Sequence, residues 1–168
     1  GKLLRTKIFD QIWIQPASGD AGGALGAALF THFQLMDKNR GPKASDSMKG
    51  SFLGPCFSNK EIQLFLSDSD APHHFYENED ELLEIVSQQL DAGKIIGWFQ
   101  GSLEFGDRAL GNRSILADPR KKDIKERINR IVKYREPFRP FAPAVLDEMV
   151  KKFFVEYQES NFMEKTVN

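Results

Sequence analysis

Apolar residues recur with helical spacing in four parts of the chain, and the residues between them are mostly polar or rich in glycine. In the clearest case, leucines and a valine fall on one face of residues 79–90, and Gly93 follows at a position typical of the left-handed turn after a helix. The predicted helices cover residues 20–32, 59–66, 79–90 and 123–132.

Short apolar runs without helical spacing predict strands. The predicted strands cover residues 9–14, which Pro16 ends, residues 94–100, which glycines bound, and residues 113–117; Phe75 and Tyr76 could form another. Prolines at positions 137, 140 and 143 argue against a central strand in that region. The mixture of helices and strands predicts an α/β chain, with α+β as the alternative.

A polar stretch at residues 37–51, rich in Gly and Ser, divides this pattern and predicts a linker or a surface loop. Residues 1–36 then form a strand-turn-helix unit, and residues 52–168 form a second domain. With 168 residues, of which 40% are hydrophobic, the chain can bury one core of ordinary size. We therefore expect one domain plus a piece of another.

The composition indicates which partners and which cellular compartment to expect for the protein. A formal net charge of -1 argues against a general nucleic-acid binder, and no apolar run reaches the roughly 18 residues of a membrane span. Cys56 is the single cysteine, so the chain forms no internal disulfide, and we expect this thiol to be buried among apolar groups. These features predict a cytoplasmic protein without a membrane partner.

Arginines supply the candidate chemistry. Residues 120–139 hold nine basic and three acidic side chains, part of which form the solvated face of a helix. Arg135 and Arg139 differ because prolines and phenylalanines lie beside them and would partly desolvate their guanidinium groups. An arginine in such a place stays charged and donates two parallel hydrogen bonds to a phosphate or a carboxylate.

Arg108 and Arg113 form a second pair, which follows Gly101 and Gly106. Glycines let the backbone approach an anion closely while neighbouring side chains close over it. If the two pairs converge, they form a pocket for a phosphate. The alternative is that nearby carboxylates neutralise the arginines in ion pairs; the candidates are Glu104, Asp107, Asp118 and Glu136.

Asp20 lies in a glycine-rich turn that leads into the first long predicted helix. A short carboxylate at this place can reach a metal ion or a nucleotide, and the start of a helix favours phosphate. The alternative is that Asp20 caps the helix while Gly22 and Gly23 allow close packing. The spacing matches neither the dinucleotide-binding motif nor the P-loop.

Several of these residues lie in motifs that resemble a known family. The segments Gly97-Trp-Phe-Gln-Gly, Arg108-Ala-Leu-Gly-Asn-Arg-Ser-Ile-Leu-Ala-Asp-Pro-Arg120, Asn129 and Arg135-Glu-Pro-Phe-Arg-Pro-Phe-Ala-Pro143 resemble the C-terminal domain of the O-carbamoyltransferases that decorate nodulation factors and antibiotics. Residues 15–29 resemble the end of the N-terminal domain of the same family, which has an actin/Hsp70-like fold.

The resemblance implies that residues 52–168 form a YrdC-like domain with a mixed sheet, and that residues 1–36 are the end of the N-terminal ATPase-like domain. We expect the chain to stop inside the YrdC-like domain and not to carbamoylate a substrate by itself. The full-length enzyme would use ATP and carbamoyl phosphate to make carbamoyl-adenylate, and its N-terminal domain would pass the carbamoyl group to a small-molecule hydroxyl.

The resemblance also assigns roles to individual residues. The expected catalytic residues are Arg108, Arg113 and Arg139; the expected cofactor-binding residues are Arg135, Lys133, Asn112, Gly22 and Gly23; and the expected metal ligand is Asp20. The expected cofactors are ATP and a divalent metal, iron or magnesium, with further metal ligands on the missing N-terminal domain.

Two positions depart from the family pattern and leave two other functions open. Ser102 stands where the family usually has arginine, and Asp107 stands where it usually has proline. These changes permit a degenerate, non-catalytic binding module. RNA binding by the basic stretch is a third hypothesis, ranked last because aromatic residues are not interleaved through the predicted basic helix.

Overall fold

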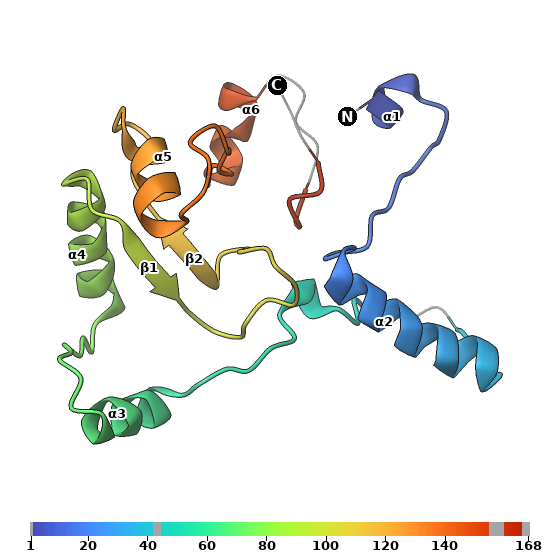
Figure 1. Ribbon diagram of the computed structural model, residues 1–168, viewed down its shortest axis with the longest axis horizontal. Helices are drawn as coiled ribbons and strands as arrows, with labels where there is room; N and C mark the ends of the chain where they lie inside the picture. Colours follow the sequence, from blue (N-terminus) through green and yellow to red (C-terminus); the bar gives the residue numbers. More distant parts are fainter. Residues whose placement is uncertain (1, 42–44, 155–159, 166–168) are drawn as a thin grey trace. The chain divides into compact units, whose positions relative to one another are not determined.

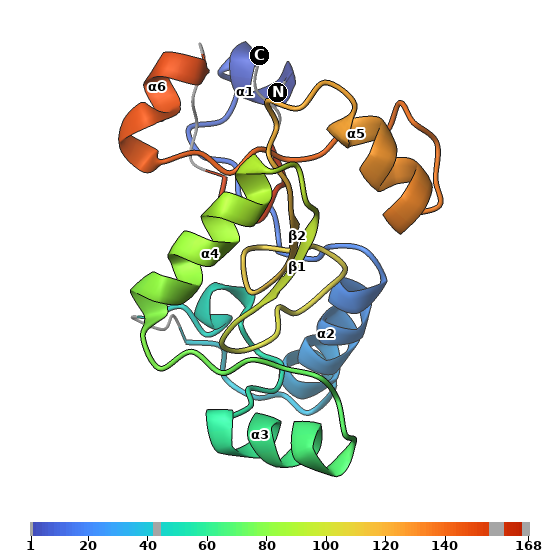
Figure 2. The same ribbon diagram turned by 90° about the vertical axis from the view of Figure 1, so that its left-hand side faces the viewer.

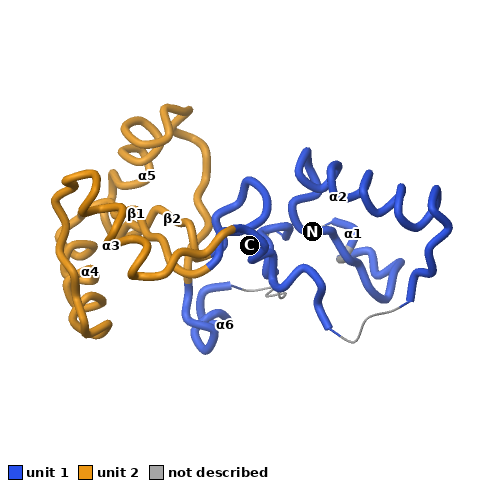
Figure 3. Tube along the Cα trace, turned by 90° about the horizontal axis from the view of Figure 1, so that it is seen from below, with its two compact units in different colours: residues 1–54, 102–110, 145–168 blue, residues 55–101, 111–144 orange. Residues whose placement is uncertain are grey.

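The computed structural model describes residues 2–41, 45–154 and 160–165. The chain divides into two units, which Figure 3 shows in different colours. The first comprises Gly1–Gly54, Ser102–Leu110 and Val145–Asn168, and the second comprises Pro55–Gly101 and Gly111–Ala144. Part of the predicted linker, residues 42–44, lies outside the described residues, and the predicted domain boundaries stay a prediction.

The second unit contains a two-stranded antiparallel sheet and four helical segments. Its elements are α3 (Asn59–Asp68), α4 (Glu79–Asp91), β1 (Ile96–Phe99), β2 (Arg113–Leu116), α5 (Ile124–Arg127) and the π-helical turn η3 (Ile128–Val132). The two strands run antiparallel side by side (Figure 1), and their register pairs Ile96 with Leu116 and Phe99 with Arg113. Helices α4 and α5 lie on either side of the two strands (Figure 2).

Local sequence signals account for the ends of α3 and α4. The Ser58 hydroxyl accepts a hydrogen bond from the Glu61 N–H, and the Glu61 carboxylate accepts one from the Ser58 N–H, which completes a capping box. The Asn78 side chain caps α4 through the Asp80 N–H, and Gly93 ends this helix with φ of +78°. Both helix predictions are confirmed.

The predicted helix over residues 123–132 also forms, but its last turn widens. The Lys133 N–H donates to the Ile128 carbonyl, five residues back, so α5 continues directly into the π-helical turn η3. Ile124 and Ile128 are buried, whereas Ile131 on the same predicted face is 52% exposed. Val132 is exposed as well, so the buried apolar face ends at Ile128, before the last two apolar residues of the predicted helix.

The first unit holds the remaining helices. They are α1 (Lys2–Thr6), α2 (Asp20–Phe30), the π-helical turn η1 (Thr31–Leu35), the 3-10 turns η2 (Lys49–Ser51) and η4 (Asp147–Met149), and α6 (Val150–Phe153). Residues 102–110 join residues 51–54 through two backbone bonds, from Gly54 N to Leu103 O at 2.9 Å and from Phe105 N to Ser51 O at 2.6 Å. These bonds tie two distant parts of the chain together.

The prediction of mixed helices and strands is confirmed, although several local expectations are wrong. No strand forms over residues 9–14 or at Phe75 and Tyr76, because neither run has a paired strand among the described residues. The strand expected over 94–100 is shorter and only half-buried, and Cys56 is exposed. In the described part of the chain, no helix is long and apolar enough to cross a membrane.

Two glycines of the first unit leave room for Ala17. A Cβ built at Gly22 would lie 2.5 Å from the Ala17 carbonyl oxygen, and one built at Gly106 would lie 2.4 Å from the Ala17 Cβ. Gly106 also has φ of +101°, which side chains rarely adopt. The neighbouring Gly23 meets nothing within 4 Å, so only Gly22 of this adjacent pair is required by packing.

Alanine substitutions at the two adjacent glycines of α2 are therefore expected to act in opposite directions. Gly23→Ala should stabilise the helix by about 0.5–1 kcal/mol, because alanine has the higher helix propensity. Gly22→Ala should destabilise it by about 1 kcal/mol or more, since a backbone carbonyl must move. Amide hydrogen exchange of α2 measures both changes, and equal protection in the two variants would contradict the packing of Ala17.

Candidate functional site

The side chain of Asn129 organises the segment that carries two of the candidate arginines. It is fully buried in η3, where its Nδ2 donates to the carbonyls of Pro137 at 3.2 Å and Arg139 at 2.9 Å. Its Oδ1 accepts a hydrogen bond from Arg135 Nε at 2.7 Å. The Asn129 amide thus holds the side chain of Arg135 and the backbone of Arg139. We call residues 133–141 the arginine loop.

Arg135 is fixed by further contacts within this loop. Its guanidinium carbon lies 4.8 Å from the centre of the Phe141 ring, which is a cation–π distance, and its Nη2 donates to the Pro140 carbonyl at 3.4 Å. The residue is half-buried. The prediction that apolar and rigid neighbours hold this guanidinium partly desolvated is confirmed for Arg135.

Arg139 and Lys133 are more open to solvent. The Arg139 side chain is 52% exposed, and its Nη1 lies 3.9 Å from Glu136, a loose ion pair between exposed groups. Lys133 is exposed, and its backbone N–H closes the π-helical turn. The arginine loop therefore places three cationic side chains within seven residues, with Arg135 the most constrained of them.

Arg113 and Asn112 belong to the same unit and lie at the start of β2. Arg113 is exposed and faces Phe99 in the register. The Asn112 carbonyl accepts the Gln100 N–H at 2.9 Å, and its side-chain nitrogen would lie 3.1 Å from a Cβ at Gly101, which has φ of +57°. Gly101 thus lets the Asn112 amide approach the end of β1 closely.

Arg108 lies in the other unit, so the convergence of all four arginines stays a prediction. Its side chain is 58% exposed, and its Nε is 4.0 Å from the Asp107 carboxylate. This contact and the Arg139–Glu136 pair are long and exposed, which gives the ion-pair alternative little support at these two positions. Asp118 instead binds Arg120.

Asp20 is exposed and is the first residue of α2, whereas Gly19 occupies the N-cap position. The interpretation of Asp20 as the N-cap is therefore wrong. The N-cap lies one residue earlier, at Gly19, and no side chain makes a capping hydrogen bond to this helix. A carboxylate in the first turn still interacts favourably with the helix dipole. In the described ranges, no group of three or more His, Cys, Asp or Glu side chains could hold a metal ion.

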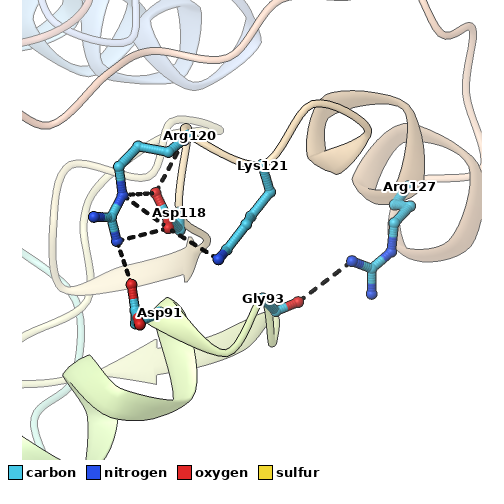
Figure 4. A network of polar contacts seen from close by, with 6 residues as sticks. All are labelled: Asp91, Gly93, Asp118, Arg120, Lys121 and Arg127. Atoms are coloured by element: carbon cyan, nitrogen blue, oxygen red, sulfur yellow. Dashed lines mark hydrogen bonds and ion pairs between the residues drawn. The ribbon is translucent and has the colours of Figure 1, made fainter.

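A charged network joins the end of α4 to the segment after β2 (Figure 4). Arg120 Nε donates to both oxygens of Asp118 at 2.9 and 3.0 Å, and its Nη2 reaches Asp91 at 2.6 Å. Lys121 lies 4.0 Å from Asp118, and Arg127 donates to the Gly93 carbonyl at 3.3 Å. These basic residues support the fold of the unit.

The protonation of Asp118 reflects this network. Hydrogen bonds from the guanidinium and then from the backbone N–H of Arg120 lower the pKa of the Asp118 carboxyl below its ordinary value, and the charge of Lys121 adds to this effect. The same pairing raises the pKa of Arg120, with Asp91 as the second partner. Both groups therefore stay charged at neutral pH.

Sequence reasoning missed the role of Asn129 and the exposure of two aromatic rings. An asparagine between Ile128 and Ile131 interrupts an apolar helical pattern, and this interruption was the available signal. Tyr134 is 86% exposed and Phe138 is 73% exposed, so two aromatic side chains are open to solvent in the arginine loop. The absence of aromatic residues from the predicted basic helix therefore does not extend to this loop.

Comparison with known proteins finds matches at both ends of the chain. A family model described as Carbamoyltransferase N-terminus matches residues 1–29, and one described as Carbamoyltransferase C-terminus matches residues 87–168. The arginine loop, Arg108 and Arg113 lie in the second match, whereas Asp20, Gly22 and Gly23 lie in the first. The matches contain the segments on which the predicted resemblance rests.

Three relatives illustrate the range of similarity. An uncharacterised protein of Synechocystis sp. is 48% identical over 97% of this chain, and nodulation protein NolO of Bradyrhizobium diazoefficiens is 42% identical over 92%. The 3'-hydroxymethylcephem-O-carbamoyltransferase of Streptomyces clavuligerus is 32% identical over 92% of the chain. Each alignment covers 27% of the relative, so the chain spans about a quarter of the length of these proteins.

The lowered pKa of Asp118 predicts a pH-dependent contribution to stability. A depressed carboxyl pKa stabilises the fold above the ordinary value of 3.8, and this stabilisation is lost as pH falls through the lowered pKa. Asp118→Asn should therefore lower the urea midpoint near neutral pH and match the unsubstituted protein in strong acid. Asp123→Asn, at a side chain that is 67% exposed, is the control and should change little. If the urea midpoints of Asp118→Asn and the unsubstituted protein differed by the same amount at every pH, the lowered pKa of Asp118 would not be the cause of the stabilisation.

Proposed function

Because the chain belongs to the carbamoyltransferase family, we propose that it is the part of an O-carbamoyltransferase that binds ATP and carbamoyl phosphate to form carbamoyl-adenylate. The carbamoyl group would then pass to the hydroxyl of a small-molecule acceptor, with the rest of the N-terminal domain as a partner. The overall balance is carbamoyl phosphate, ATP and water giving carbamoyl-adenylate, phosphate and pyrophosphate.

The observation that carries this proposal is the arginine loop. Arg135 is oriented by a buried amide and an aromatic ring, and Arg139 has its carbonyl held by the same amide. Both proposed ligands present phosphate oxygens, which a planar guanidinium binds through two parallel hydrogen bonds. A guanidinium that is already oriented loses less freedom on binding, so its contribution to affinity is larger.

The other candidate residues have supporting roles in this proposal. Arg113 and Arg108 would add positive charge for a second phosphate or for charge that develops during carbamoyl transfer. Asn112 and Lys133 would contact the nucleotide, and Gly22 and Gly23 would do so at the start of α2. The contact between Gly22 and Ala17 gives Gly22 a packing role as well.

The divalent metal that the family implies does not fit a site built from the described residues alone. Asp20 is an exposed carboxylate at the start of a helix, and the described ranges hold no cluster of three ligands. Asp20 would be one ligand among several, the others supplied by the rest of the N-terminal domain. The proposal for this chain therefore assigns no step to the metal.

Isothermal titration with carbamoyl phosphate and with ATP tests the assignment of the arginines. Arg135→Ala and Arg139→Ala are each expected to weaken the Kd for carbamoyl phosphate by about tenfold or more, because each removes charge-assisted hydrogen bonds. Arg130→Ala, at an exposed arginine in η3 outside the arginine loop, is the control and should have little effect. Unchanged affinity in both loop variants would refute the site. Binding by this chain without activity of the full-length protein that contains it would favour a non-catalytic module.

RNA binding is a second candidate function, favoured by the exposure of Tyr134 and Phe138 beside the cationic residues of the arginine loop. Exposed rings next to basic side chains are typical of surfaces on which single-stranded bases stack. This function predicts that Tyr134→Ala weakens binding of a single-stranded oligonucleotide and that affinity falls steeply with salt. Filter binding at several salt concentrations measures both effects, and full displacement of the oligonucleotide by carbamoyl phosphate would favour the carbamoyltransferase assignment instead.

A further inference from the structure

We propose that Asn129 is the positioning residue of the arginine loop and that it sets Arg135 to bind an anion through the outer end of its guanidinium group. This inference rests on the proposed function, since it concerns how the loop holds a phosphate-bearing ligand. Asn129 itself is fully buried, so it acts through Arg135 and Arg139 without touching the ligand.

Four hydrogen bonds connect Asn129 to the arginine loop. Its backbone carbonyl accepts the Arg135 N–H at 3.0 Å, and its Oδ1 accepts Arg135 Nε at 2.7 Å. Its Nδ2 donates to the carbonyls of Pro137 and Arg139. Asn129 thus holds the backbone of the loop at residues 135, 137 and 139, and it holds the Arg135 side chain directly.

The widened turn of η3 makes this arrangement possible. In a regular helix, the Asn129 carbonyl would accept a bond from the fourth residue ahead, whereas here it binds the N–H of Arg135, six residues ahead. Single π-helical turns inside α-helices are rare and occur frequently at functional sites. The turn directs the chain back over Asn129, so the loop folds around the side chain.

The bond to Nε determines which edge of Arg135 remains for a ligand. A guanidinium can bind an oxyanion through its Nε and Nη edge or through its two Nη groups. Asn129 occupies Nε, and among the described residues Arg135 Nη1 makes no hydrogen bond. Nη2 donates one of its two hydrogens to the Pro140 carbonyl, so Nη1 and the second hydrogen of Nη2 form the edge available to a phosphate, while the face of the guanidinium lies on Phe141.

The chemistry of position 129 explains why an amide is needed there. A buried polar group is costly unless its hydrogen bonds are made, and this position offers two carbonyls that need donors and one N–H that needs an acceptor. Aspartate provides the acceptor but neither donor, and leucine provides none of them. Glutamine carries the same amide on a chain that is one methylene longer, so it displaces all three partners.

Titration of variants at position 129 with carbamoyl phosphate tests the proposal. Asn129→Ala and Asn129→Gln should each weaken binding by about tenfold, comparable with the loss of Arg135 itself. In an Arg135→Ala background, Asn129→Ala should add less than about threefold, because its main effect passes through the absent guanidinium. In an Arg113→Ala background, its full effect should remain.

A spectroscopic measurement separates positioning from a purely structural role. The Nε–H resonance of Arg135 in a ¹⁵N spectrum should be protected from exchange in the unsubstituted protein and lose that protection in Asn129→Gln. Asn78→Ala is the control, since it removes the exposed helix-cap bond of another asparagine in the same unit. The control should lower stability and leave both the resonance and the affinity unchanged.

The outcomes distinguish this inference from the proposed function. If Arg135→Ala and Arg139→Ala bind carbamoyl phosphate normally, the anion site itself is refuted. If those variants bind weakly while a folded Asn129→Gln binds normally, the positioning role alone is overturned and the site stands. Equal weakening by Asn129→Ala with and without Arg135 would also overturn it, and Asn129→Gln decides the question if the alanine variant does not fold.

Discussion

The buried amide of Asn129 is tolerated only when its donors and its acceptor are all satisfied, and the chain from Arg135 to Arg139 supplies every partner. This requirement shapes the end of the helix as much as it shapes the loop. A regular helical turn would leave the amide without these partners, so the π-helical turn and the loop conformation depend on each other. The orientation of Arg135 on Phe141 follows from the same constraint.

Polar contacts hold the second unit together because its buried apolar core is small. Ile124 and Ile128 are the buried apolar residues of this unit in the described part of the chain, and much of the remaining apolar surface is partly exposed. Arg120 links Asp91 to Asp118, and Arg127 binds the backbone at the end of α4. Cationic residues in one basic stretch thus have two different tasks: some join secondary structure elements, and those of the arginine loop remain available for a ligand.

The sequence predicted features that depend on neighbours along the chain. The helices over 59–66 and 79–90 could be predicted because their apolar spacing and their caps lie within each segment. The strand predicted over 9–14 does not form, because a strand needs a paired neighbour and the sequence of this run does not show whether one is present. For the candidate site, residue types showed which arginines could bind an anion, but the bonds from Asn129 reach six to ten residues ahead and depend on a turn that periodicity does not predict.

The close approach at Ala17 has an evolutionary consequence. Its carbonyl and its methyl group each face a glycine that comes from a different part of the first unit, and neither glycine can become smaller. A larger residue at position 17 therefore has no compensating change at positions 22 or 106, and a side chain at either of those positions requires the backbone at 17 to move. We expect these three positions to keep small residues among related sequences, because a larger side chain at one of them cannot be offset at the other two.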